Sequence, residues 1–175
     1  MILKTTILAL CSVMVIGCGG GDGGTNGGNS SYTTSTNGMK LVSNDITPGG
    51  TIEDDLTPNG TGESPHLKWS GIPANTNLFF GIVDDPNLTE LQRDVSGTAN
   101  LPANVGEGMN SAGTQQYEGP NPPVGEKHKY RFCIYGLSSA TGIDLNTAYD
   151  NDTFATNFKS TITGSACFSA YYTGK

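Results

Sequence analysis

Histidine, tyrosine and aspartate residues carry the side chains in this chain that are best suited to ligand binding. His128 and Tyr130 are two residues apart in a run that alternates as a strand does, so both point to one face of that strand. An imidazole N–H and a phenol O–H can each donate to a phosphate or carboxylate oxygen. Asp85, in the turn Asp84-Asp85-Pro86, is a carboxylate of the kind that can accept from an imidazole N–H or from a ligand amine. Side chains of these types can bind a small anion where a fold brings them together.

The same residues also have plainer interpretations. His128 can be a hydrogen-bonded histidine at the start of a core strand, and two aspartates before a proline form an ordinary turn. Asp85 and His128 can also be an acid/base pair. Nucleophilic catalysis needs a Ser, Thr or Cys held by a base, and no G-x-S-x-G segment occurs. Without an evident oxyanion hole, we expect no enzymatic activity.

Composition excludes several classes of function. Lys and Arg total 9 against 16 Asp and Glu, which gives a formal net charge of -7. Such a chain cannot neutralise a run of phosphates, so we expect no nucleic-acid binding. None of the 4 Cys forms a C-x-x-C pair and only 2 His are present, which excludes a zinc site of the usual spacing. We expect no metal and no cofactor.

The hydrophobic pattern predicts a mostly-β domain. The 25 glycines and the abundant Thr and Asn favour short strands and many turns. The expected strands cover residues 39–43, 66–69, 77–83 and 130–137. In the last of these, Tyr130, Phe132 and Ile134 lie on one face, and Cys133 and Leu137 on the other.

One C-terminal helix is expected. Asp152 can cap its N-terminus, and Phe154, Phe158 and Ile162 follow at helical spacing as one apolar stripe. Because the segment is rich in Thr and Asn, its helix propensity is poor and packing must stabilise it.

The N-terminus has the pattern of an exported protein. Residues 1–17 contain one positive charge and a short apolar run, as a signal peptide does. The segment Val15-Ile16-Gly17-Cys18 resembles the bacterial lipobox, which predicts lipidation of Cys18 and anchoring to the cell envelope. Gly19 after that cysteine favours the outer membrane. An ordinary secretory peptide with an incidental cysteine is the alternative.

A Gly-, Asn-, Ser- and Thr-rich segment follows the lipidation site. Together with Cys18 it covers residues 18–38 and predicts a flexible tether. The folded domain is then expected to cover residues 39–175. Cys133 and Cys167 are its only thiols. Export makes a disulfide between them possible, and Cys133 can equally be a small buried apolar residue.

Several segments, in order and spacing, resemble the phosphatidylethanolamine-binding protein family, and specifically its bacterial YbhB/YbcL branch, which is Raf kinase inhibitor-like. They are SPHLKWSGIP at residues 64–73, VDDP at 83–86, GMNSAG at 108–113, GPNPPVG at 119–125 and HKYRF at 128–132. The resemblance covers most of residues 39–137. It implies a two-sheet antiparallel β-sandwich with a C-terminal helix and a small anion-binding pocket at one end.

The resemblance also implies a set of ligand-binding residues. Carried over by position, they are Asp85, Gly119, Pro120, Pro122, Pro123, His128 and Tyr130. The implied function is non-catalytic binding of a small anionic group, such as a phosphate ester, a phospholipid headgroup or a carboxylate. The alternatives are a protein-interaction or inhibitor module of the kinase or protease inhibitor type, and a structural envelope domain with a degenerate pocket.

One segment departs from the family pattern. The family carries an aromatic-rich strand with His-Trp after the D-D-P turn, and residues 87–99 contain neither a His nor a Trp. A second pocket histidine and an apolar wall are therefore absent from the sequence. A wider or wetter pocket than the family's, or a non-functional one, is the consequence to expect.

Overall fold

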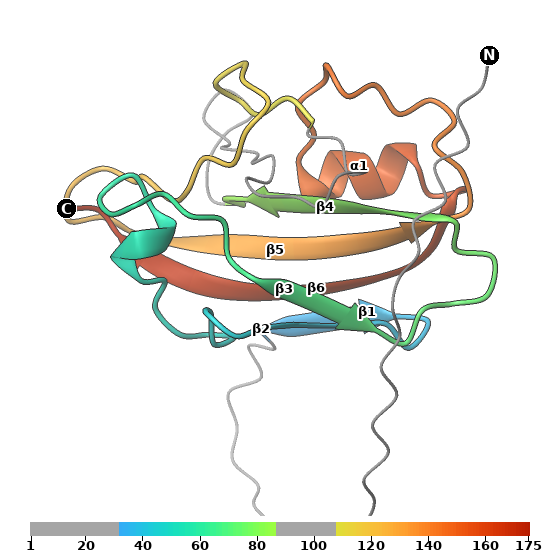
Figure 1. Ribbon diagram of the computed structural model, residues 1–175, viewed down its shortest axis with the longest axis horizontal. Coiled ribbons are helices and arrows are strands. Elements are labelled where there is room, and N and C mark those ends of the chain that lie inside the picture. The colour runs from blue at the N-terminus through green and yellow to red at the C-terminus, as the bar shows by residue number, and fades with distance from the viewer. Residues whose placement is uncertain (1–31, 87–107) are drawn as a thin grey trace, which may run out of the picture.

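The fold is built on a four-stranded antiparallel sheet with strand order β1-β6-β5-β4. A two-stranded antiparallel sheet, β2-β3, faces it from one side and α1 lies on the other (Figure 1). The computed structural model describes residues 32–86 and 108–175. The elements are β1 (Thr33–Thr36), β2 (Lys40–Ser43), the 3-10 helix η1 (Asp54–Leu56), β3 (Leu67–Ser70), β4 (Leu78–Asp84), β5 (Lys127–Leu137), α1 (Asn151–Asn157) and β6 (Ile162–Thr173). The expected mostly-β fold is confirmed.

Strand β5 separates two hydrophobic cores. Tyr130, Phe132 and Ile134 face the sandwich core between the two sheets, whereas Cys133 and Leu137 face the helix core under α1. This is the alternation that the sequence predicts for a strand buried on both faces. The sandwich core consists of Met39, Leu41, Ile46, Ile52, Leu56, Val83, Tyr130, Phe132, Ile134, Ala166, Phe168, Ala170 and Tyr172. The helix core consists of Ile82, Cys133, Tyr135, Leu137, Tyr149, Phe154 and Phe158.

The helix differs from its expected form. Its N-cap is Asp150, whose side chain accepts from the backbone N–H groups of Asp152 and Thr153, so the expectation that Asp152 is the cap was wrong. Phe154 and Phe158 pack into the helix core as expected, but Ile162 begins β6. Within the described residues no helix has the length and hydropathy of a membrane span.

The last element is the strand β6 and not a helix. Its buried positions alternate from Gly164 to Tyr172, but three of them are Gly164, Ala166 and Ala170. Small residues weaken the period-2 hydrophobic signal, which is why the sequence alone did not predict this strand. It is nevertheless central, because it pairs with β1 on one side and β5 on the other.

The folded part also begins earlier than expected. Thr33–Thr36, placed in the tether by composition, forms the edge strand β1 against Ser165–Phe168 of β6. Threonine is β-branched and suits extended backbone, and the partner strand satisfies its main-chain groups. A turn with Asn37 and Gly38 at positive φ then leads into β2. The signal peptide, Cys18 and the tether up to residue 31 lie outside the described residues.

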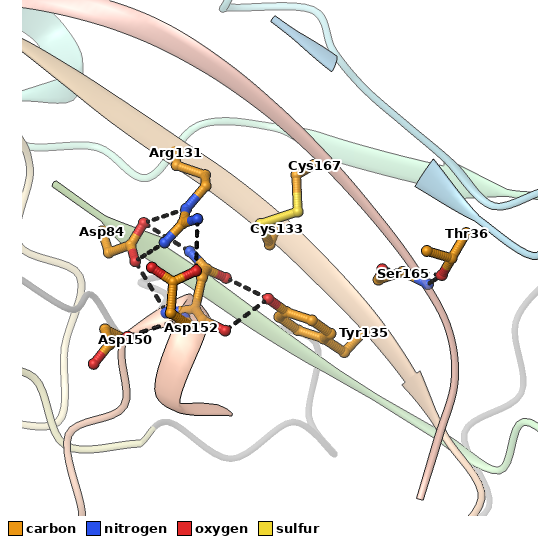
Figure 2. The surroundings of a disulfide bond; sticks show 10 residues. Thr36, Asp84, Arg131, Cys133, Tyr135, Asp150, Asp152, Ser165 and Cys167 are labelled. Atoms are coloured by element: carbon orange, nitrogen blue, oxygen red, sulfur yellow. Dashed lines mark hydrogen bonds and ion pairs between the residues drawn. A yellow bond between two sulfur atoms is a disulfide. The ribbon is translucent and has the colours of Figure 1, made fainter. Parts of the chain in front are cut away.

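A disulfide links the two central strands. Cys133 of β5 and Cys167 of β6 are direct register partners, and their sulfur atoms are bonded at 2.06 Å (Figure 2). The crosslink lies on the helix-core side of the sheet. The sequence left two interpretations open for Cys133, a disulfide-bonded cysteine or a small buried apolar residue. In the structure Cys133 is disulfide-bonded.

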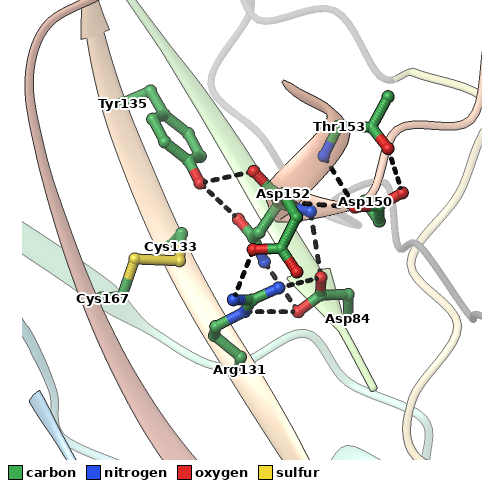
Figure 3. A network of polar contacts seen from close by, with 9 residues as sticks. Asp84, Arg131, Cys133, Tyr135, Asp150, Asp152, Thr153 and Cys167 are labelled. Carbon is green, nitrogen blue, oxygen red and sulfur yellow. Dashed lines mark hydrogen bonds and ion pairs between the residues drawn. A yellow bond between two sulfur atoms is a disulfide. The ribbon is translucent and has the colours of Figure 1, made fainter. Parts of the chain in front are cut away.

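A buried carboxylate fastens α1 to the sheet. Asp84, which is 0% exposed, accepts from Arg131 Nε at 3.0 Å and Nη2 at 2.8 Å. Asn151 adds its backbone N–H at 2.9 Å and its side-chain amide at 2.8 Å. The outer guanidinium nitrogen of Arg131, Nη1, contacts Asp152 at 3.0 Å (Figure 3). Four donors compensate the desolvation of the Asp84 charge.

We expect Asp84→Asn to lower the free energy of unfolding by about 3 kcal/mol, because it leaves Arg131 and the helix N-terminus without their buried partner. Asp152→Asn is the matched control, since it removes an exposed carboxylate from the same guanidinium and should change stability by less than about 1 kcal/mol. Urea unfolding followed by circular dichroism measures both. Equal effects of the two variants would contradict a structural role for the buried pair.

Candidate functional site

The turn after β4 sends two adjacent carboxylates to opposite faces of the sheet. Asp84 is the last residue of β4 and faces α1, whereas Asp85 turns toward the sandwich-core side. Strand β4 ends with Asp84 opposite Arg131, four residues after the start of β5 at Lys127. This antiparallel register brings Asp85 to His128, near the start of β5. Asp85 is 0% exposed, and its Oδ2 lies 2.6 Å from His128 Nδ1.

His128 lies between two carboxylates of different exposure. Its Nδ1 contacts the buried Asp85, and its Nε2 is 3.1 Å from Oε2 of Glu126. The His128 side chain is 12% exposed and that of Glu126 is 61% exposed. An imidazolium has two N–H donors, and here each has a carboxylate acceptor. The ring is therefore fixed in orientation, with Nε2 as the donor on its accessible side.

The carboxylates also control the charge of the ring. Partial burial lowers the pKa of His128, but the hydrogen bonds that the ring donates to Asp85 and Glu126, together with the negative charges of these two residues, raise it by more. The net result is a pKa above the ordinary value of 6.5. Carboxylate acceptors at both ring nitrogens favour the protonated form of His128, and this cation is the group that can attract an anion.

The Gly- and Pro-rich loop is held between η1 and the end of β6. Gly119 approaches so closely that a Cβ there would lie 2.2 Å from the carbonyl oxygen of Leu56. Further along, Glu126 N–H donates to Pro123 O at 2.9 Å across a turn in which Gly125 has φ +81. A type II turn needs such a residue. The amide of Gly174 donates to Glu126 O at 3.0 Å and so ties the turn to the C-terminus.

The residues implied by the family resemblance do not all lie in equivalent surroundings. Gly119, Pro120 and Pro122 are buried and Pro123 is exposed. Tyr130 shares the face of His128 and is 2% exposed in the sandwich core. The structure brings Asp85 and His128 into direct contact, whereas the hydrogen bonds of the loop run to Gly174, just after β6, and within its own turn. Residues 87–99, where the sequence lacks the second family histidine, lie outside the described residues.

Sequence reasoning missed two residues beside His128. Glu126 contacts its ring from the turn that precedes β5, so strand alternation gave no signal for it. Tyr172 of β6 is the register partner of His128. Its hydroxyl donates to Asp54 Oδ1 at 3.0 Å and accepts from Asn59 Nδ2 at 2.9 Å. That residue was missed because β6 was not predicted. In the described parts of the chain, no group of three His, Cys, Asp or Glu side chains is arranged to hold a metal ion.

We expect the His128 ring to titrate with a midpoint above the ordinary value of about 6.5. Because the pKa is higher in the folded protein than in the unfolded one, the charged ring stabilises the fold. That contribution is complete below about pH 6.5 and is lost as the pH rises through the folded pKa. The midpoint is measured by NMR of the ring protons in a His66→Gln background, which leaves one histidine in the chain.

Glu126→Gln serves as the matched variant for this titration. Removing one of the two carboxylates at the ring should lower the midpoint, because one source of the raised pKa is lost. A midpoint at or below 6.5 in the His66→Gln protein, or no response to Glu126→Gln, would contradict the arrangement of charges described above.

Comparison with known proteins identifies the family of this chain. A family model for the phosphatidylethanolamine-binding protein matches residues 42–173. The UPF0098 protein YbhB of Escherichia coli is 31% identical over 123 residues, which are 57% of this chain and 78% of YbhB. A UPF0098 protein of Methanothermobacter thermautotrophicus is 28% identical over 123 residues, 61% of this chain and 81% of that protein. The crystal structure of E. coli YbcL, described as a new member of the mammalian PEBP family, matches with a TM-score of 0.67 at 21% identity, over 79% of this chain and 99% of that chain. This chain belongs to the phosphatidylethanolamine-binding protein family.

Proposed function

We propose that this protein binds a small anionic group at His128 without transforming it. The ligand class is a phosphate ester, a phospholipid headgroup or a carboxylate. One observation carries the proposal: Nε2 of His128 already donates to an oxyanion, the Oε2 atom of Glu126 at 3.1 Å. An internal carboxylate thus marks the position in which an external oxygen would accept the same hydrogen bond.

Preorganisation of the donor supports the proposal. The buried Asp85 holds Nδ1 at 2.6 Å, so the ring does not need to reorient when a ligand arrives. The neighbouring turn is fixed by the hydrogen bonds of Glu126 N–H to Pro123 O and of Gly125 N–H to Gly174 O. A rigid site loses little conformational entropy on binding, which raises its affinity for a given set of contacts.

The charges at the site support binding more than catalysis. A general base needs a free nitrogen within reach of a substrate proton, and both ring nitrogens of His128 have carboxylate partners. Those partners also raise the pKa of His128 and thereby disfavour the neutral form that a base requires. The protonated ring is suited to holding an anion in place.

Binding is tested by an NMR titration of the full chain with phosphate, phosphoethanolamine, glycerophosphate and acetate. We expect saturable shifts at His128, Tyr130 and the loop 119–125, with dissociation constants on the order of 1 mM for such small ligands. His128→Ala should weaken binding at least tenfold, because a charge-assisted hydrogen bond contributes about 1.5–3 kcal/mol. Asp85→Asn should also weaken it, because the ring loses its buried acceptor.

His66→Ala is the control for loss of an imidazole elsewhere, since His66 is exposed in another part of the chain. It should bind as the unmodified protein does. No shifts at millimolar ligand, or equal binding by His128→Ala, would contradict an anion site at His128. The protein-interaction and inhibitor alternative would then be the one to pursue.

The proposal also includes a location, the bacterial outer membrane, to which lipid on Cys18 would anchor the protein. The lipobox-like segment before Cys18 supports it. The disulfide between Cys133 and Cys167 adds independent support, because disulfides persist in oxidising compartments and are rare in the cytosol. Two or more acyl chains hold a protein stably at a membrane.

Metabolic labelling with an alkyne-tagged fatty acid in a Gram-negative host tests the anchor. We expect the full chain to be labelled and to fractionate with the outer membrane. Cys18→Ser should abolish the label, whereas Cys11→Ser, which changes the other cysteine of the N-terminal segment, should retain it. Labelling that survives in Cys18→Ser would show that the lipobox assignment is wrong.

A further inference from the structure

Among the described residues, the groups that contact the His128 ring carry more negative than positive charge. The ring lies between Asp85 and Glu126, so a protonated ring and two carboxylates leave one negative charge in excess. The register partner on β6, Tyr172, binds Asp54, and Asp54 is itself paired with Lys175. Lys127 and Lys129 occupy strand positions that direct both lysines to the face of β5 opposite His128. There the Nζ atom of Lys127 lies 4.6 Å from the centroid of the Tyr171 ring.

Glu126 is held close to Nε2 by its backbone. Its N–H donates to Pro123 O at 2.9 Å, and its carbonyl accepts from Gly174 at 3.0 Å. Its Cα is therefore anchored, while its side chain is 61% exposed and can leave the ring for water. A ligand that takes Nε2 must displace this carboxylate, but the carboxylate remains within a few ångströms of the bound anion.

We propose that Glu126 determines the specificity of the site by disfavouring doubly charged ligands. The selected class is a singly charged oxyanion, such as a phosphodiester or a carboxylate, in preference to a phosphate monoester. This assignment rests on the anion site proposed above. The need to displace Glu126 weakens the binding of every anion by a common factor. Repulsion from the displaced carboxylate is different, because the Coulomb energy scales with the charge of the ligand and so penalises a dianion more.

The test uses two probes that differ by one methyl group and by charge. Dimethyl phosphate is singly charged, and monomethyl phosphate carries a charge of about −1.5 to −2 near pH 7, as phosphate monoesters do. The full chain and its Glu126→Gln variant are titrated with each probe at about pH 7 by NMR. We expect Glu126→Gln to raise the affinity for monomethyl phosphate by on the order of fivefold more than that for dimethyl phosphate. Acetate, also singly charged, should respond as dimethyl phosphate does.

The comparison of ratios separates this effect from a change in the ring. Glu126→Gln also removes one of the causes of the raised pKa of His128. Any resulting loss of ring charge would weaken the binding of monomethyl phosphate more than that of dimethyl phosphate. This is opposite to the expected change. Asp152→Asn removes an equal charge from the other face of the sheet, beside Arg131, and should leave the ratio unchanged.

Each outcome has a defined meaning. A shift in the ratio with Glu126→Gln alone supports the role of Glu126. Binding of both probes with an unchanged ratio, or an equal shift with Asp152→Asn, overturns that role and leaves the anion site intact. Failure of every probe to bind either protein overturns the anion site at His128, and the inference about Glu126 with it.

Discussion

The antiparallel register between β4 and β5 is the constraint on which the rest of the structure depends. Because Asp84 lies opposite Arg131, the next residue, Asp85, must turn to the other face, where His128 is its neighbour. One strand end thus supplies a carboxylate to each side of the sheet. On one side the carboxylate fastens the helix, and on the other it orients an imidazole. A one-residue shift of the register would exchange the two faces and remove both contacts.

The two carboxylates solve the problem of buried charge in different ways. Asp84 is compensated by an arginine and by two donors from Asn151, all within an arrangement that serves stability. Asp85 contacts a ring whose second nitrogen is on the accessible side, beside an exposed glutamate. In the first arrangement the charge of Asp84 is already compensated by protein donors, so a ligand would add little stabilisation. The second leaves a charged donor whose present acceptor is in contact with water, and this makes it the better place for binding.

The same sheet connects the site to the rest of the molecule. Strand β6 lies between β1 and β5, carries half of the disulfide, and places Tyr172 beside His128. Gly174, the residue after its end, also holds the turn from which Glu126 projects. At the left end in Figure 1, η1 and the C-terminus lie together with the start of β5. The site is therefore assembled from segments that are distant in sequence and supported by the best-paired strands of the fold.

The sequence by itself determined the mostly-β class and the two faces of β5, because alternation is a local property of the chain. Asp85 and His128 were candidates through the resemblance to the family, and the tertiary structure decided their contact. Only the tertiary structure decided the edge strand at Thr33–Thr36 and the long strand β6, since main-chain pairing with a distant partner outweighs weak local propensity. It also decided that the charges of Asp84 and Glu126 lie in different surroundings. Both are acidic residues beside a candidate site, and what separates them is burial: one has its charge compensated inside the protein, and the other keeps its charge in water beside the histidine.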